Sequence, residues 1–423
     1  MKFVTDRSTI DGTIIVPGSK SHTIRAFYFG LLADGESTVV DPLMSQDANS
    51  SISVVQKFGA KINKIGTKYL VNGVNGKPQI PDDIIDVGNS GTTINIGISV
   101  ASLVDGYTVF TGDHQIRNRP VQSLQSALNS LGADVICTKN NGKPPVIIKG
   151  RAKGGNAEIN GISSQYLTSL LINAPLYEND TNITVKNLCE LPYVDITLRW
   201  LDELGIKYNN DNYKFFNIPG NQKYKPFTKR IPGDFSSATF FIVLGAIPGN
   251  RMVLKNLDIK DPQGDKLVLD IVKEMGASVE IKDDEIIITG NKLKGIEIDM
   301  DSIPDALPAI SALATQCEGT TIIRNVAHAR LKETDRIRVM HDELKKLNAE
   351  ISELEDGLVI KRSILTGGTI NGHHDHRIVM SMAILGQVIR EKLIIDTAEA
   401  SAVTFPDFAD FLRLSGGKIE ILK

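Results

Sequence analysis

The feature that most constrains the fold of this chain is an internal repeat. A helix-like segment, a Gly-Ala pair or a near equivalent, a strand, a polar turn and a second strand recur six times. The copies are 73, 73, 71, 72 and 68 residues apart, so together they account for all 423 residues. Glycine or asparagine directly after a helix is typical of the C′ position, which needs a positive φ. In the six copies that residue is Gly59, Gly132, Gly205, Gly276, Asn348 and Gly416.

The repeat predicts an α/β fold of six similar units. The chain is too long for one hydrophobic core, so we expect two similar domains of three units each. The alternation after the glycine, as in Lys61-Ile62 and Ser278-Val279-Glu280, predicts half-buried strands. We place the crossing between the domains near PGDFSSATFF, because the segment from Tyr208 to Lys229 is polar and rich in Asn, Lys and Pro. A doubly wound protein with parallel strands is the alternative, but it does not predict the even spacing.

Composition excludes several classes of protein. The net charge of −3 gives no electrostatic case for nucleic acid or an anionic membrane, so any anion site must be local. The three cysteines lie far apart without a CxxC pair, which argues against a disulfide framework or a zinc knuckle and suits a reducing compartment. No apolar run approaches the roughly 18 residues of a membrane span, and the N-terminus lacks the apolar core of a signal peptide. We therefore expect a cytoplasmic protein.

Four segments place glycine, hydroxyl or arginine residues at the start of a predicted helix. They are VPGSKSHTIRA, DVGNSGTTINI, GDHQIRNRPVQSL and ISSQYLTSL. Hydroxyls, basic side chains and free N–H groups at a helix N-terminus can bind an anion. A capped helix start is the plain alternative for each segment, and the Walker A pattern GxxxxGK[ST] is absent.

Two further segments, IDMDSIPDALPAI and RLKETDRIR, contain acidic candidates. Asp305 follows a proline and opens an apolar helix, so it is either an N-cap or a catalytic base. Thr334 is the expected N-cap of the next helix, whose buried stripe is Ile337, Met340, Leu344 and Leu347. Arg336 then lies in the first turn, where a cation opposes the helix macrodipole. This misfit favours an anion ligand for Arg336.

The segment NGHHDHRIVMSMAI carries three histidines and one more arginine at a helix start. His373, His374 and His376 lack HxxxH spacing and have no partner cluster elsewhere, so we expect no metal and no cofactor. Arg377 resembles the other arginines in its position. If the helices of each domain run parallel, their N-terminal ends converge and face a cleft between the domains. Such a cleft would attract anions despite the negative net charge.

Eight segments, in order along the chain, resemble the motifs of one enzyme family. PGSKSHTIR, GNSGTT, RNRP, SSQ, PYVDITL, IPDA, RLKETDR and DHR are similar to those of the 5-enolpyruvylshikimate-3-phosphate synthase family of enolpyruvyl transferases. The resemblance implies two domains, each of three βαβαββ units, with the N-terminal strand in the C-terminal domain. The expected domains are residues 19–229, with repeats one to three on the shikimate-phosphate side, and residues 1–18 plus 230–423. The second domain would hold repeats four to six, with phosphoenolpyruvate and the acid/base groups.

The implied reaction, a step of chorismate biosynthesis, moves the enolpyruvyl group of phosphoenolpyruvate to the 5-hydroxyl of shikimate 3-phosphate. It releases phosphate by addition and elimination through a tetrahedral intermediate, and needs acid/base groups and cations around charged substrates. The expected partners are these two small molecules, without nucleic acid or membrane, and we expect a monomer.

The resemblance also implies a role for individual residues. Asp305 would be the base for the hydroxyl, Glu333 the acid/base at the methylene carbon, and Lys20 a bridge between the substrates. The expected phosphoenolpyruvate contacts are Lys20, Gly91, Arg119, Gln165, Arg336 and Arg377. The expected shikimate 3-phosphate contacts are Lys20, Ser21, Arg25, Ser163, Ser164, Gln165, Tyr193, Asp305 and Lys332.

Four positions depart from the family pattern. Glu190 with Leu191 stands where a serine is common, Val403 replaces a lysine, Asn95 an arginine and His328 an asparagine. A carboxylate beside a phosphate is unfavourable, so another acceptor alcohol is an alternative. Binding of a phosphorylated metabolite without turnover is a third reading. The related transferase that acts on UDP-N-acetylglucosamine is disfavoured, because GDHQIRNRP lacks its loop cysteine.

Overall fold

The computed structural model describes residues 1–423 and divides into two compact units. Unit 2 is the continuous segment Gly18–Ile231, and unit 1 combines Met1–Pro17 with Pro232–Lys423. Each unit has its own hydrophobic core. None of the helices combines the length and the apolar character needed to span a bilayer.

Unit 2 contains three four-stranded sheets. Their strand orders are β14-β3-β5-β4, β6-β7-β9-β8 and β10-β11-β13-β12. The strands are β3 (Glu36–Val40), β4 (Lys61–Ile65), β5 (Lys68–Asn72), β6 (Ile85–Asp86), β7 (Tyr107–Thr111), β8 (Asp134–Cys137), β9 (Val146–Lys149), β10 (Gly155–Asn160), β11 (Thr181–Lys186), β12 (Asn209–Asp211), β13 (Phe215–Ile218) and β14 (Thr228–Arg230).

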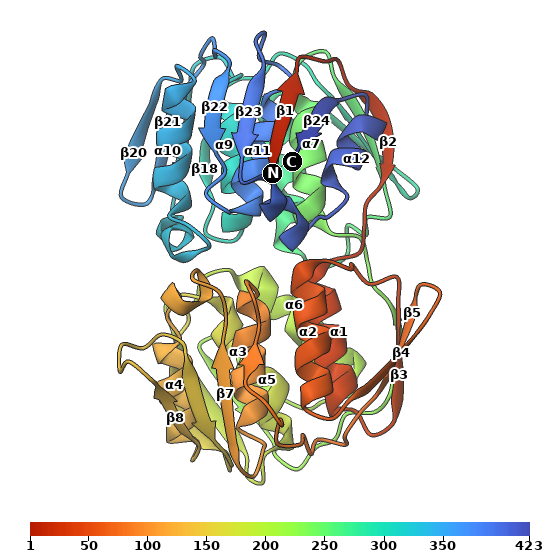
Figure 1. The fold of residues 1–423 in the computed structure, drawn as a ribbon, viewed down its shortest axis with the longest axis vertical. Coiled ribbons are helices and arrows are strands. Elements are labelled where there is room, and N and C mark those ends of the chain that lie inside the picture. Colours follow the sequence, from red (N-terminus) through yellow and green to blue (C-terminus); the bar gives the residue numbers. More distant parts are fainter. The chain divides into compact units, whose positions relative to one another are not determined.

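Unit 1 also contains three four-stranded sheets. Their orders are β16-β17-β15-β2, β18-β19-β21-β20 and β22-β23-β1-β24. The strands are β1 (Lys2–Asp6), β2 (Asp11–Ile15), β15 (Arg251–Lys255), β16 (Ser278–Lys282), β17 (Glu285–Thr289), β18 (Glu297–Asp299), β19 (Thr320–Arg324), β20 (Ile351–Leu354), β21 (Gly357–Lys361), β22 (Gly368–Asn371), β23 (Leu393–Asp396) and β24 (Lys418–Leu422). The two chain ends meet in this unit, because β1 pairs with β24 along its full length (Figure 1).

Every sheet repeats one pairing pattern. One edge pair is parallel, as in β6 with β7 and β18 with β19, and the remaining pairs are antiparallel. The doubly wound alternative, with wholly parallel strands, is therefore wrong. Two of the sheets take their parallel edge strand from a distant part of the chain. β2 supplies the parallel edge beside β15, and β14 does the same beside β3.

The helices of each repeat differ in burial. Nearly all residues of the first helix of each repeat are buried, whereas the second helix is buried on one face only. The inner helices are α1 (Lys20–Leu32), α3 (Gly91–Ala101), α5 (Ser164–Asn173), α7 (Phe235–Ala246), α9 (Leu307–Ala314) and α11 (His376–Leu385). The outer helices are α2 (Gln46–Lys57), α4 (Gln122–Ser130), α6 (Leu191–Glu203), α8 (Leu267–Met275), α10 (Arg336–Lys346) and α12 (Phe408–Leu414). Short 3₁₀ segments are η1 (Ile116–Asn118), η2 (Ala174–Leu176), η3 (Gly264–Lys266), η4 (Pro304–Ala306), η5 (Ala327–Leu331) and η6 (Ala398–Val403).

The residue that marks the repeat has the backbone conformation predicted for it. All six positions have positive φ, from 67° at Asn348 to 120° at Gly276. Five of them lie at C′, while Gly276 is the C-cap residue of α8 itself. The sharp turn after each outer helix therefore fixes the period of the chain.

The predicted half-burial of the following strand is wrong in three copies, because β4, β12 and β16 contain no buried residue. β4 and β16 are edge strands with mostly exposed residues, including Ile65 at 62% and Ile281 at 50% exposure. The strand next to each, β5 and β17, instead alternates between buried and more exposed residues. Since β4, β12 and β16 each lie at the edge of a sheet, a period-two pattern marks a strand there without marking burial.

Candidate active site

In unit 1, the N-terminal ends of several helices meet around Arg336. This arginine is the first residue of α10 and is only 1% exposed. Its guanidinium donates to Asp375 Oδ2 at 2.8 Å, to Asp305 Oδ1 at 2.7 Å and to Glu333 Oε2 at 2.5 Å. Burial opposes its charge, but the three carboxylates outweigh burial and raise the pKa of Arg336 well above its usual value. Arg336 is therefore a charged group held in one orientation.

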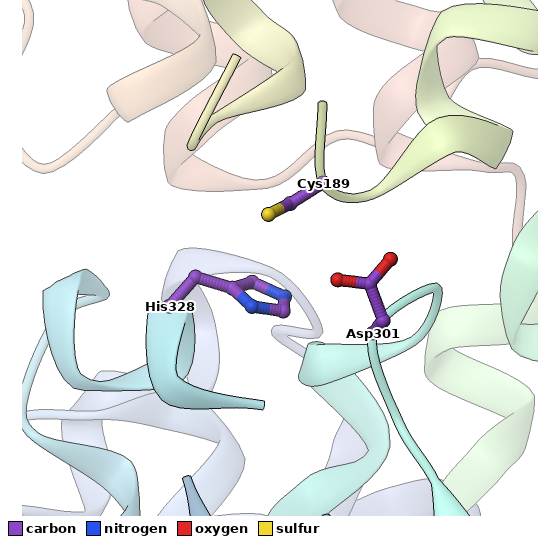
Figure 2. A group of neighbouring side chains, drawn as sticks. All are labelled: Cys189, Asp301 and His328. Carbon is purple, nitrogen blue, oxygen red and sulfur yellow. The ribbon is translucent and has the colours of Figure 1, made fainter. Parts of the chain in front are cut away.

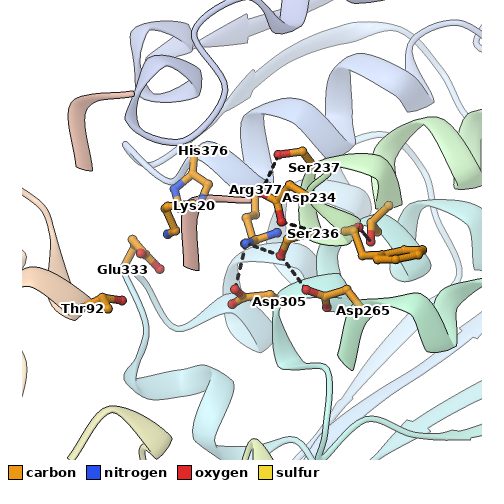
Figure 3. A network of polar contacts seen from close by, with 12 residues as sticks. Lys20, Thr92, Asp234, Ser236, Ser237, Asp265, Asp305, Glu333, His376 and Arg377 are labelled. Carbon is orange, nitrogen blue, oxygen red and sulfur yellow. Dashed lines mark hydrogen bonds and ion pairs between the residues drawn. The ribbon is translucent and has the colours of Figure 1, made fainter. Parts of the chain in front are cut away.

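Arg377 joins the same cluster from α11. Its Nη2 lies 2.8 Å from Asp305 Oδ2 and also donates to Ser236 Oγ, in the first turn of α7, at 2.8 Å (Figure 3). Asp305 thus accepts from two arginines, one on each carboxylate oxygen. The cluster joins side chains from η4, α7, α10 and α11, which are far apart in sequence. Asp305, Glu333, Arg336 and Arg377 are brought together within this one unit.

One alternative and one expectation about helix capping are wrong. Asp305 lies inside η4, and α9 begins at Leu307 without any side-chain cap, so Asp305 is not an N-cap. Asp335, not Thr334, caps α10 by accepting from the backbone N–H of Arg338 at 3.0 Å. Thr334 instead donates its hydroxyl to Asp375 Oδ2 at 3.1 Å. The buried stripe of α10 at Ile337, Met340, Leu344 and Leu347 is confirmed.

Asp375 is a member of the cluster that the sequence analysis gave no role. Its Oδ1 accepts from the backbone N–H of Arg377 and so caps α11, while both its oxygens accept from Arg336. The carboxyl is fully buried. The signal was present as an aspartate two residues before the arginine in DHR, at a helix start. Asp375 links the start of α10 to that of α11 and fixes the two arginines with respect to each other.

In unit 2, Arg25 is a buried cation surrounded by neutral acceptors. It is 2% exposed and donates to Thr197 Oγ1, to the carbonyls of Ser21 and Tyr193, each at 2.9 Å, and to Thr168 Oγ1 at 3.3 Å. Burial lowers the pKa of Arg25 to about 10, with a smaller opposing effect of Tyr193, so the group remains charged at neutral pH. A buried charge without a carboxylate partner favours an anionic ligand.

A second group of unit 2 gathers at the start of α3. Gly91 opens this helix, and a Cβ there would collide with the guanidinium of Arg119. Only glycine therefore lets Arg119 lie against this helix N-terminus. Gln165, in the first turn of α5, accepts from Asn95 Nδ2 at 2.8 Å and donates to Thr92 Oγ1 at 3.3 Å. Asn95, one of the four departures, thus orients the Gln165 amide.

Glu190 lies against the start of α5. Its carboxylate is 2% exposed and its Oε2 accepts from Ser164 Oγ at 2.8 Å and from the Ser164 backbone N–H at 3.3 Å. Ser163 is the N-cap of the same helix and accepts from Gln165 N. Glu190 itself has the left-handed φ of 57° just before α6. The carboxylate therefore occupies donors of a helix N-terminus that could otherwise bind an anion.

The remaining predicted residues lie in both units. Lys20 opens α1 and pairs with Asp47 Oδ2 of α2 at 3.1 Å. Ser19, its N-cap residue, makes no capping hydrogen bond, so the plain capped-helix reading fails there. Lys332 follows η5 directly before Glu333, and Val403 ends η6 with 8% exposure.

Unit 1 also places Asp301 near His328, another of the four departures. A carboxylate oxygen of Asp301 and a ring nitrogen of His328 lie within 4.8 Å of each other, and His328 is buried (Figure 2). Cys189, also drawn, belongs to unit 2. Two ligands from one unit do not complete the four-coordinate set that zinc prefers, so we assign no metal to this pair.

Comparisons with known proteins agree with one another. A family model described as EPSP synthase (3-phosphoshikimate 1-carboxyvinyltransferase) matches residues 4–412. The chain is 54% identical to the 3-phosphoshikimate 1-carboxyvinyltransferase of Acetivibrio thermocellus over 98% of each chain, and 53% identical to that of Ruminiclostridium cellulolyticum over 100% of each. The solved structure of EPSP synthase from Acinetobacter baumannii superposes with a TM-score of 0.85 and 29% identity, covering 100% of both chains. The fold with two sets of three repeats is thus shared with that enzyme.

Proposed function

Because the chain belongs to the EPSP synthase family, we propose that it transfers the enolpyruvyl group of phosphoenolpyruvate to the 5-hydroxyl of shikimate 3-phosphate and releases phosphate. The observation that carries this proposal is the unit 1 cluster. Asp305, Glu333, Arg336 and Arg377 come from three separate segments and contact one another. Two carboxylates beside two fixed cations suit acid/base chemistry on an anionic substrate.

The reaction requires three proton transfers, one at the 5-hydroxyl oxygen and two at C3 of phosphoenolpyruvate. The 5-hydroxyl oxygen bonds to C2 of phosphoenolpyruvate while its proton passes to a base, and C3 gains a proton to become a methyl group. Loss of phosphate and of a C3 proton then restores the double bond. We assign Asp305 as the base that accepts the hydroxyl proton. We assign Glu333, in its protonated form, as the acid that gives C3 a proton and takes one back in the elimination, because both carboxyl groups are part of the cluster around Arg336.

The arginines of the cluster would stabilise the phosphate and carboxylate of phosphoenolpyruvate. At present each guanidinium is paired with carboxylates, so an incoming anion competes with Asp305 for Arg336 and Arg377. That competition would release Asp305 to accept a proton from the hydroxyl. In the proposal, phosphoenolpyruvate is also bound by residues of unit 2, namely Lys20, Gly91, Arg119 and Gln165. The acid/base groups Asp305 and Glu333 belong to unit 1.

The proposed binding of shikimate 3-phosphate rests mainly on Arg25. This buried cation has only neutral hydroxyl and carbonyl acceptors around it, so a substrate anion nearby would balance its charge. We propose that Ser21 and Arg25 bind the shikimate carboxylate. The other proposed contacts are Lys20, Ser163, Ser164, Gln165, Tyr193, Asp305 and Lys332.

Phosphate release from phosphoenolpyruvate tests the proposal. We expect release by the purified protein that requires shikimate 3-phosphate and is absent with unphosphorylated shikimate. No release with shikimate 3-phosphate, in protein that still binds phosphoenolpyruvate, would contradict it. This chain departs from the family pattern at Glu190, Val403, Asn95 and His328. Another acceptor alcohol is nevertheless not favoured, because two relatives more than 50% identical over nearly the whole chain are both named 3-phosphoshikimate 1-carboxyvinyltransferase.

The state of the cysteines bears on the location of the protein in the cell. The three cysteines form no disulfide, and Cys137 and Cys317 are buried thiols, which suits a reducing compartment. We propose a cytoplasmic monomer that needs no cofactor. Cell fractionation and light scattering of the purified protein test the first two points, and full activity after dialysis against a chelator tests the third.

A further inference from the structure

The charges around the two arginines of unit 1 do not balance. Arg336 and Arg377 contribute two positive charges, and five neighbouring carboxylates contribute five negative ones, a sum of −3 when every group is ionised. The carboxylates are Asp234, Asp265, Asp305, Glu333 and Asp375. An anionic ligand bound there adds further negative charge, which is unfavourable at this low exposure. One way to reduce the repulsion is for a carboxylate to take up a proton.

Asp265 is one of the three carboxyl groups of this set, with Asp234 and Asp375, that the proposed reaction does not use. It lies in η3, is 3% exposed, and its Oδ2 accepts from Ser236 Oγ at 2.6 Å. The same Ser236 oxygen accepts from Arg377 Nη2 at 2.8 Å. Figure 3 shows this chain of hydrogen bonds from Arg377 through Ser236 to Asp265. Asp265 is therefore linked to an anion-binding arginine through one bridging hydroxyl.

The surroundings of Asp265 favour its protonation. Burial raises the pKa of Asp265 to about 6; Asp305 and Asp234 also raise it, while Arg377 and the Ser236 hydrogen bond lower it. By contrast, Asp305, Glu333 and Asp375 each have a direct guanidinium contact, which protonation would weaken. A protonated Asp265 keeps an oxygen that can still accept from Ser236.

From this geometry, we propose that Asp265 takes up a proton from solvent when an anion such as phosphoenolpyruvate binds at Arg377, with Ser236 transmitting the coupling. Asp265 is then a positioning residue that adjusts the charge behind Arg377 and does not touch the substrate. The inference rests on the proposed function for the choice of phosphoenolpyruvate, but it applies to any anion bound by this arginine.

The direction of the effect follows from linkage. Bound anion stabilises the protonated form, so affinity rises as pH falls, by at most about tenfold per pH unit for one proton. The affinity for the anion depends on pH only above the pKa of Asp265 in the free protein, which is about 6. Below that pH the carboxyl is already protonated before the anion binds. His376 is a second titratable group of the cluster, with Nδ1 3.9 Å from Asp375 Oδ1, so its contribution must be separated from that of Asp265 by mutation.

Calorimetric titration of the full chain tests the proposal. Phosphoenolpyruvate, and separately inorganic phosphate, is titrated near pH 7 in buffers of different ionisation enthalpy, which gives the protons taken up per ligand. We expect a clear fraction of one proton for the native protein and a value near zero for Asp265→Asn, with affinity that no longer depends on pH. Asp270→Asn, which removes an exposed carboxylate of α8, is the matched control and should behave as the native protein does.

Native-like proton uptake in Asp265→Asn would overturn the proposal and would indicate His376 or another group. Ser236→Ala provides a second variant, which keeps Asp265 but removes the bridge, and we expect weaker uptake from it. If Asp265→Asn does not fold, the titration of the native protein still tests the proposal, because the absence of proton uptake on anion binding would overturn it. Turnover is measured separately: active enzyme without linkage contradicts only this inference, whereas linked anion binding without turnover contradicts only the proposed function.

Discussion

At the residue scale, the candidate site is a set of charges held in unusual pairings. Arg336 is buried among three carboxylates, while Arg25 is buried among neutral acceptors and Glu190 among helix N-terminal donors. A buried charge is tolerated only when partners stabilise it, and the nature of these partners determines which ligand can bind. We therefore expect Arg25 to favour the binding of an anionic acceptor and Glu190 to oppose it.

Glu190→Gln should strengthen binding of shikimate 3-phosphate. Glutamine can still accept from Ser164 Oγ and N–H, but the charge that opposes a phosphate at the start of α5 is removed. We expect the KM for shikimate 3-phosphate to fall by about five- to tenfold, the equivalent of about 1 kcal/mol for a partly screened charge pair. Steady-state kinetics at saturating phosphoenolpyruvate measure it. An unchanged or higher KM would show that the acceptor phosphate binds away from Glu190.

Asp265 should make the stability of the protein depend on pH. Its pKa is about 6 in the folded protein against 3.8 ordinarily, so the folded state holds the proton more tightly. The free energy of unfolding is then lowered progressively as pH rises from about 4 to about 6. Asp265→Asn should be more stable than the native protein by about 1–3 kcal/mol above that range and similar to it near pH 4. Urea unfolding at several pH values measures the difference; equal stability at all pH values would contradict it.

Much of the site could be anticipated from single residues, and the failures have physical causes. Arginines and serines at helix starts pointed to Arg336, Arg377 and Ser164, because a helix N-terminus has a known charge preference. Arg25 was expected at a helix start as well, but it is the sixth residue of α1. Asp265, at the end of DPQGD, gave no such signal, since its importance depends on Ser236 of another element. The wrong cap at Thr334 arose because two good capping residues stand side by side and only tertiary contact with Asp375 decides between them.

At the element scale, the repeat is set by how each outer helix ends. The six C-terminal residues with positive φ turn the chain sharply into an edge strand, and this geometry was readable from Gly and Asn alone. The burial of the strand that follows could not be read in this way, because it depends on the packing around that edge of the sheet. Local conformation is encoded locally here, whereas exposure is decided by packing.

Asn348 allows a direct test of the role of positive φ, because it is the one of the six positions that is not glycine. Its φ is 67° at C′ of α10. Asn348→Ala should lower the free energy of unfolding by about 1 kcal/mol, since a Cβ without a local hydrogen bond is disfavoured in this conformation, and Asn348→Gly should not. Urea unfolding of both variants measures this, with Asn348→Gly as the matched control. Equal losses in both would indicate that the asparagine side chain, not the backbone, is what matters.

At the scale of the whole molecule, the two units differ in how the chain builds them. Unit 2 is one continuous segment, whereas unit 1 needs β1 and β2 from the N-terminus to complete two of its sheets. The even repeat predicted six similar units, but not that β14 and β2 each complete a sheet distant in sequence. Such pairing between distant segments leaves no local pattern in the sequence.

Residues 18–231 should therefore fold alone. They contain three complete sheets and their own core, so we expect a cooperative unfolding transition for this fragment. Residues 232–423 without the first 17 should not fold cooperatively, because β23 and β24 would lose the strand between them. Circular dichroism during urea titration measures both fragments. A cooperative transition in the second, or none in the first, would contradict the account.

The central claim is that the unit 1 cluster performs acid/base chemistry at the methylene carbon of phosphoenolpyruvate. The most direct test is to run the reaction in D₂O and measure deuterium in the vinyl CH₂ group of the product by mass spectrometry and NMR. Addition followed by elimination passes through a methyl group, so we expect deuterium in the product. Glu333→Gln should form product at least about 100-fold more slowly, as for loss of a general acid/base, while still binding phosphoenolpyruvate. Product free of deuterium, or a fully active Glu333→Gln variant, would contradict the account.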